Sequence, residues 1–176
     1  MHDSGWEAWH DFFLLTGTAG VTLTGLLFVV VSFGAQVIAE RSESGVRAFV
    51  TPNVYHLTAA FAASAALLGP GLSRHAIGTA LSAGALASMA YLLYTRAHRH
   101  WRVNRLTRAD WVWYVGLPWI AYLLCLLAGI GVLLDWPLSQ PLVAVVVVVL
   151  LIAGIRNAWD LILWMTQQMR SEKSRP

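Results

Sequence analysis

PLVAVVVVVLLIAGIRNAWDLILWM, from Pro141 to Met165, is the stretch that decides the fold class of this chain. Its apolar length exceeds the roughly 20 residues that a helix needs to cross the hydrocarbon core of a bilayer. Two charged side chains, Arg156 and Asp160, interrupt it one helical turn apart. Because charged groups at membrane depth are costly to keep there, this pair is the first candidate for a functional site.

The composition of the whole chain agrees with a membrane protein. Of its 176 residues, 57% are hydrophobic and 12% are charged, whereas soluble domains average about 25% charged residues. We predict an all-α integral membrane helical bundle, a single transmembrane domain over residues 1–176 with five transmembrane helices. The predicted spans cover residues 12–38, 52–68, 76–95, 112–134 and 142–165.

The flanking charges predict the orientation. The N-terminal flank carries Asp3, Glu7 and Asp11 but no Lys or Arg, which argues against a cleaved signal peptide. One side of the predicted bundle has a single basic residue, Arg74. The basic residues of the opposite side are Arg41, Arg47, Arg96, Arg99, Arg102, Arg105, Arg108, Arg170, Lys173 and Arg175. The positive-inside rule then places the N-terminus outside and the C-terminus in the cytoplasm, in a multi-pass protein of the inner (plasma) membrane.

The basic connection between the third and fourth spans has two interpretations. Arginines interleaved with histidines and Trp101 could form an RNA-binding patch, but topology and anionic headgroups already account for them. We therefore expect lipid contact and no nucleic acid. The expected headgroup ligands are Arg96, Arg99, Arg102, Arg105 and Arg108.

Small and hydroxyl-bearing residues crowd the outer half of the first span. In lipid, such residues allow close helix approach, so helix packing is the simpler interpretation. The alternative is a polar path, or a face turned to the same helix of another subunit. The residues concerned are Gly17, Thr18, Gly20, Thr22, Thr24 and Gly25, with Thr16 beside them. The third span has similar stripes at Gly78, Ser82 and Ala85, and at Ala80, Gly84 and Ser88.

Depth makes the Arg156 and Asp160 pair informative. Counted from Thr166 at about 1.5 Å per residue, Asp160 lies roughly 9 Å and Arg156 roughly 15 Å inside the cytoplasmic end. Side chains lean toward a helix N-terminus, so the arginine points away from the nearer interface and Asp160 leans back toward it. We expect the two side chains to form an ion pair.

An arginine in hydrocarbon needs further hydrogen-bond partners. The second span offers them, since Thr51 and Pro52 resemble an N-cap and first helical residue. His56 then lies about 7 Å inside, near the level of Asp160. The sequence predicts a cluster of Asn53, His56, Arg156, Asn157 and Asp160, extended by Tyr55.

Two interpretations of this cluster remain open. It can be a buried network that determines which helices pack together, or it can mark an ion path, a proton path or a polar ligand site open to the cytoplasm. Histidine titrates near neutral pH, which suits a proton relay.

Other chemistry has less support. Only His56 lies clearly inside a span, so haem is not expected, and no HExxH, GxSxG or cysteine metal pattern appears. A His and an Asp near a lipid headgroup could act as acid and base, but no nucleophile accompanies them. We expect no enzyme activity, no cofactor and no metal. Pro118 predicts a kink in the fourth span.

Three segments carry a resemblance to a known group of proteins. Residues 9–13 (WHDFF) and 24–29 (TGLLFV) resemble the first helix of small, uncharacterised bacterial inner-membrane proteins, and residues 156–161 (RNAWDL) resemble their closing helix. The resemblance implies a multi-span membrane protein and no particular activity.

The leading functional hypothesis is an oligomeric ion or proton conductor, because so small a bundle has little interior for a cavity of its own. The alternative is a non-conducting partner or regulatory subunit of a larger membrane complex.

Overall fold

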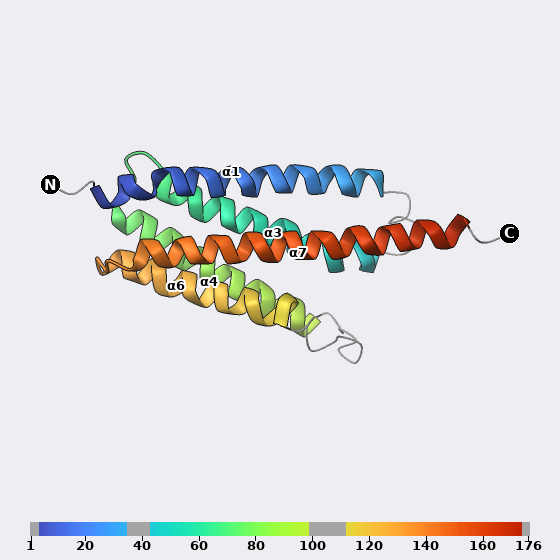
Figure 1. Cartoon of the computed structure of the whole chain (residues 1–176). Helices are drawn as coiled ribbons and strands as arrows, with labels where there is room; N and C mark the ends of the chain where they lie inside the picture. The colour runs from blue at the N-terminus through green and yellow to red at the C-terminus, as the bar shows by residue number, and fades with distance from the viewer. Residues whose placement is uncertain (1–3, 35–42, 99–111, 174–176) are drawn as a thin grey trace.

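The computed structural model of the chain describes residues 4–34, 43–98 and 112–173. These ranges hold five α-helices, which run alternately in opposite directions along one long axis (Figure 1). The all-α fold class is therefore confirmed. The elements are α1 (Ser4–Phe33), α3 (Glu43–Leu68), α4 (Arg74–His98), the π-helical turn η2 (Val112–Gly116), α6 (Leu117–Leu133) and α7 (Ser139–Lys173).

Three of the helices are long and apolar enough to cross a membrane. They contain Trp9–Phe33, Arg74–Tyr94 and Ser139–Gln167, and they identify a multi-pass membrane protein. The apolar parts of the other two helices, Asn53–Leu68 and Leu117–Leu133, are shorter. Five crossings thus stay a prediction, as does the orientation of the chain.

The surface of the bundle supports the same class. Leu15 exposes 70% of its area and Phe33 exposes 86%, and many other large apolar side chains on all the long helices face outward. A water-soluble protein rarely exposes apolar patches of this extent. Such a surface is compatible with contact to lipid chains rather than to water.

The predicted helix start at Thr51 and Pro52 is wrong, whereas the apolar part of this helix, Asn53–Leu68, agrees with the predicted span 52–68. Thr51 and Pro52 do not open a helix, because α3 begins at Glu43 and continues through both residues. A proline inside a helix loses one backbone hydrogen bond and is locally unfavourable. Membrane helices tolerate this loss where neighbouring groups satisfy the freed carbonyl. The boundaries of α1 and α7 also extend beyond the predicted spans, to Ser4 and Lys173, and residues 35–38 of the first span lie outside the described ranges.

The structure has a π-helical turn next to Pro118, the residue at which the sequence predicts a kink. The residues just before it, Val112–Gly116, form a π-helical turn, and the α-helix resumes at Leu117. A proline ring clashes with the carbonyl one turn earlier, and the wider π turn relieves that clash. Pro118 itself is buried.

The helices divide into two tightly packed groups. In one group α1 lies against α3, and in the other α4 lies against α6, while α7 contacts α1, α3 and α6 (Figure 1). Consecutive helices α3 and α4 share a short turn but diverge from it. The apolar core lies where α7 meets both groups; its most buried members include Leu57, Ala121, Val143, Val146 and Leu150.

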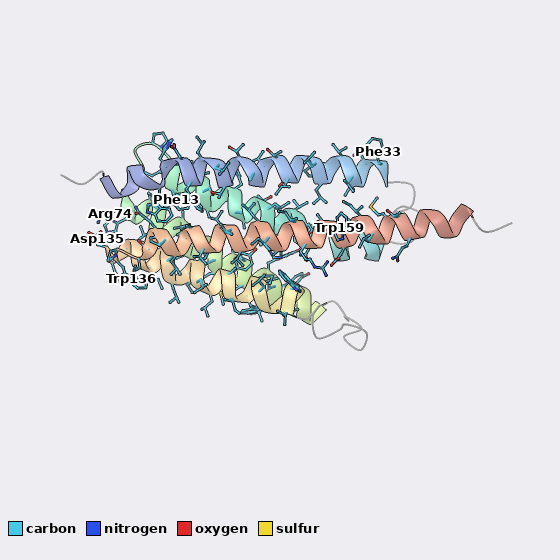
Figure 2. All side chains as sticks on the ribbon, viewed as in Figure 1. Phe13, Phe33, Arg74, Asp135, Trp136 and Trp159 are labelled. Atoms are coloured by element: carbon cyan, nitrogen blue, oxygen red, sulfur yellow. The ribbon has the colours of Figure 1, made fainter. Side chains whose placement is uncertain are left out.

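An ion pair joins the two turns at one end of the bundle. Arg74, at the start of α4, contacts Asp135 in the turn between α6 and α7. Figure 2 shows both side chains at this end with Trp136, and Phe33 lies at the opposite end of α1. Asp135 has a positive φ of 60°, a conformation that aspartate tolerates better than bulkier residues.

Candidate functional site

The expected ion pair between Arg156 and Asp160 is present on α7. The Arg156 Nη1 donates to Asp160 Oδ1 across one helical turn. The arginine side chain is 40% exposed and the aspartate 22%. The pair is therefore half-buried in the side of an apolar helix, where a solvating environment is needed to keep both groups charged.

Asn53 and Asn157 are the most unusual polar residues of the interior. Their exposed fractions are 0% and 2%, and neither the amide oxygen nor the amide nitrogen of either residue has a hydrogen-bond partner among the described residues. Leaving a polar group unpaired in an apolar interior costs about 1–3 kcal/mol. These two amides are therefore the groups most in need of a partner that the described side chains do not supply.

The packing of α3 against α7 places the two asparagines at one level. A Cβ atom added to Gly154 would lie 2.6 Å from Leu57 Cδ2, so these residues meet at the seam. Because the two helices are antiparallel (Figure 1), Asn157 and Asn53 both lie about one turn further toward the same end. Beyond them, toward the same end, lies a second apolar cluster formed around Leu27, Leu161 and Met165.

His56 has a partner that the sequence did not reveal. Its Nδ1 lies 2.7 Å from the hydroxyl oxygen of Tyr122 on α6. Both side chains are buried, with exposed fractions of 1% and 2%. A buried tyrosine hydroxyl nearly always needs a partner, so Tyr122 in an otherwise apolar span was the available signal. The described hydrogen bond of His56 thus links α3 to α6 rather than to the α7 ion pair.

Tyr55 belongs to the same group of hydroxyls. It donates to Ser88 Oγ on α4 at 3.1 Å, and Ser88 in turn donates to the Gly84 carbonyl at 2.6 Å. Its ring stacks on Tyr91 with a centroid separation of 4.6 Å. The side chains of Tyr55, His56, Ser88 and Tyr122, which we call the hydroxyl cluster, connect α3, α4 and α6.

The small residues of α1 separate into two faces. Gly17 and Gly20 pack against α3, where an added Cβ would lie 3.1 Å from Ser64 Cβ and 3.0 Å from the Leu57 carbonyl oxygen, respectively. The Thr16 hydroxyl lies 3.1 Å from Ser64 Oγ at the same contact, and Thr24 donates to the Gly20 carbonyl. The residues of the other face are exposed: Thr18, Thr22 and Gly25.

The remaining predicted residues belong to the basic connection. Arg96 lies on α4, near its last turn, and Arg99, Arg102, Arg105 and Arg108 lie outside the described residues. The expected headgroup contacts therefore stay predictions. Within the described ranges, no group of three or more His, Cys, Asp or Glu side chains is arranged to hold a metal ion.

The His56–Tyr122 hydrogen bond predicts the effect of one substitution. Tyr122→Phe leaves the buried imidazole nitrogen without its partner, so we expect the free energy of unfolding to fall by about 1–3 kcal/mol. Unfolding in mixed micelles, followed by tryptophan fluorescence, measures this change. Ser32→Ala is the control, since the Ser32 hydroxyl is exposed and, among the described residues, donates to the Phe28 carbonyl of its own helix. Equal stabilities of the two variants would contradict the prediction.

Comparison of the chain with protein-family models, with curated proteins and with solved structures found no match to any of them.

Proposed function

We propose that this protein conducts protons or small ions across the inner membrane as a homo-oligomer, with its polar site in the cytoplasmic half. The observation that carries the proposal is the pair of buried amides of Asn53 and Asn157, which have no hydrogen-bond partner among the described residues. In hydrocarbon such groups are stable only with water or a polar solute as partner. Water at this depth is the first requirement of a conduction path.

The ion pair supports the same proposal. Arg156 neighbours Asn157 in the chain, and both Arg156 and Asp160 keep partial exposure on a helix that is otherwise apolar at this level. Charged residues inside spanning helices usually face a water-filled cavity or the interior of a bundle. An opening to water from the end where α7 terminates would solvate the ion pair and the amides together.

A homo-oligomer would supply the rest of the path. Thr18, Thr22 and Gly25 form an outward-facing stripe on α1, and nothing lies within 4 Å of a Cβ added to Gly25. Close packing of this stripe against the same stripe of other subunits would align hydroxyl groups around a shared axis. The path would then run between subunits.

A second candidate function has its own observation. Within one subunit, the interior between the polar site and the turn that contains Asp135 is filled by buried apolar side chains such as Val143, Val146 and Leu150. That packing suits a non-conducting partner or regulatory subunit of a larger membrane complex, docked through the exposed stripe of α1. The two candidates differ in one measurable property, which is flux.

Proton flux into liposomes that contain the purified protein tests the proposal. A potassium diffusion potential drives entry, and a trapped pH-sensitive dye reports it; a sodium or chloride gradient tests the other ions. We expect flux that Asp160→Asn lowers roughly tenfold or more. Removing the charge of Asp160 beside Arg156 should raise the free-energy barrier to conduction by over about 1.4 kcal/mol at moderate dielectric. The matched control is Asp135→Asn, which removes the aspartate of the other Arg–Asp pair.

The outcomes separate the candidates. Flux that depends on Asp160 and not on Asp135 supports conduction through the polar site. Flux unaffected by either change contradicts it. No flux with any ion, together with co-purification of a larger membrane protein that is lost when Gly25 is replaced by Leu, supports the second candidate.

A further inference from the structure

The divergence of α3 and α4 leaves a groove in the side of the bundle. Its volume is about 330 Å³. One wall comes from α3 and the other from α4, and Tyr122, Cys125 and Leu150 form the floor. Figure 1 shows the α4 and α6 pair tilting away from α1 and α3, which is the geometry that opens the groove.

The walls of this groove are made of residues too small to fill it. Ala59, Ala62 and Ala66 lie on the α3 side, and Ala80, Gly84 and Ala87 lie on the α4 side. Apart from the adjacent residues and backbone of α4 itself, none of the described residues has an atom within 4 Å of a Cβ added to Gly84. The groove is therefore a space that lipid-phase molecules reach directly, with a smooth apolar lining.

The hydroxyl cluster closes one end of the lining. Tyr55, Ser88 and Tyr122 all line the groove. Tyr55 donates its proton to Ser88 Oγ and Ser88 donates its own to the Gly84 carbonyl, so the Tyr55 oxygen keeps both lone pairs as acceptors and the Ser88 oxygen keeps one. Tyr122 shares one hydrogen bond with His56, and when the imidazole Nδ1 carries the proton, the phenol proton is free to donate. The end of the groove thus matches a group that both donates and accepts.

Charge narrows the class of ligand. No acidic or basic side chain is among the described residues that line the groove, so a charged headgroup would find no counter-ion there. The volume equals that of about a dozen methylene groups, at roughly 27 Å³ each on the scale of a 30 Å³ water. We infer that this groove binds a single-chain, uncharged lipid, with the apolar chain along the alanine walls and a hydroxyl head against Tyr55, Ser88 and Tyr122.

A second groove shows why the hydroxyl cluster matters. It lies between α1 and α7, has a volume of about 210 Å³, and is lined by apolar residues such as Leu26, Ile155 and Trp159. It offers any lipid chain the same dispersion contacts and no hydrogen bond. Selective binding of a hydroxyl-bearing lipid is therefore specific to the groove between α3 and α4.

Photo-crosslinking with a diazirine-labelled monoacylglycerol tests the inference. The probe is added to the purified full-length protein in nanodiscs, and mass spectrometry locates the labelled peptides. We expect labels on the α3 and α4 walls, and competition by monoolein but not by lysophosphatidylcholine, whose zwitterionic head carries a phosphate and an ammonium charge. Gly84→Leu fills the groove and should abolish this labelling. Ala83→Leu is the matched control, because Ala83 is exposed on the same helix but is not among the residues that line the groove.

A hydroxyl variant tests recognition of the head. Tyr55→Phe keeps the ring and removes the oxygen, so we expect about fivefold weaker competition by monoolein, as for the loss of one hydrogen bond. Labels spread evenly over the outer surface, labelling unchanged by Gly84→Leu, or equal competition by lysophosphatidylcholine would each overturn the inference. Tryptophan fluorescence verifies that each variant is folded before labelling. This result is independent of the flux measurement.

Discussion

Gly129→Val should strongly destabilise the packing of α4 against α6, lowering the free energy of unfolding by about 2–3 kcal/mol. A Cβ at residue 129 would lie 2.8 Å from the Ser82 backbone nitrogen and 3.0 Å from the Gly78 carbonyl oxygen. The constraint is reciprocal, since a Cβ on Gly78 would lie 2.8 Å from the Gly129 carbonyl oxygen. Backbone atoms cannot rotate aside as side chains do, so α4 and α6 must separate.

The measurement is unfolding in mixed micelles, with Gly25→Val as the matched control. Both changes replace a helical glycine by the same side chain, and only residue 129 has neighbours for it to strike. Valine also favours helix more than glycine does, so the control should be neutral or slightly stabilising. Two variants of equal stability would show that α4 and α6 do not meet at these glycines.

Asn53→Leu should stabilise the protein, raising the free energy of unfolding by about 1–3 kcal/mol, and should abolish proton or ion flux. The amide of Asn53 is fully buried and has no partner among the described residues. Replacing a buried amide that has no protein partner by an apolar side chain of similar size removes the cost of keeping the amide, and any water ordered on it, in an apolar interior. If the site conducts, the same change removes a group that binds water or the permeating ion.

Ser64→Ala is the control for this prediction. Ser64 is as deeply buried as Asn53, but its hydroxyl lies 3.1 Å from Thr16 Oγ1. Removing a satisfied hydrogen bond should destabilise the protein by about 1 kcal/mol. If Asn53→Leu also destabilises the protein, the Asn53 amide makes a structural hydrogen bond, and this result would argue against the conduction site.

The local features of the candidate site followed from residue spacing. Arg156 and Asp160 meet because residues four apart on a helix share a face and lean in a known direction. Gly17 and Gly20 lie at a helix contact because small residues permit close approach in lipid. Regularities of one helix are visible in its own sequence, so these predictions needed no knowledge of neighbouring helices.

The partners contributed by other helices could not be found in this way. The position of His56 in its helix does not indicate that Tyr122 is its hydrogen-bond partner, because Tyr122 lies 66 residues further along the chain. Likewise, the small-residue stripe of α4 did not reveal which of its faces would meet α6 and which would line a groove. The answer depends on how two pairs of helices tilt against α7.

The sequence by itself determined the all-helical class, the apolar lengths that mark a membrane protein and the ion pair on α7. These properties depend on hydrophobic length and on the 3.6-residue period, which are local. Only the tertiary structure decided that α3 continues through Pro52, that Asn53 and Asn157 are buried at one level of the contact between α3 and α7, and that α3 and α4 line a groove. Those features result from contacts between distant segments, where packing outweighs local preference.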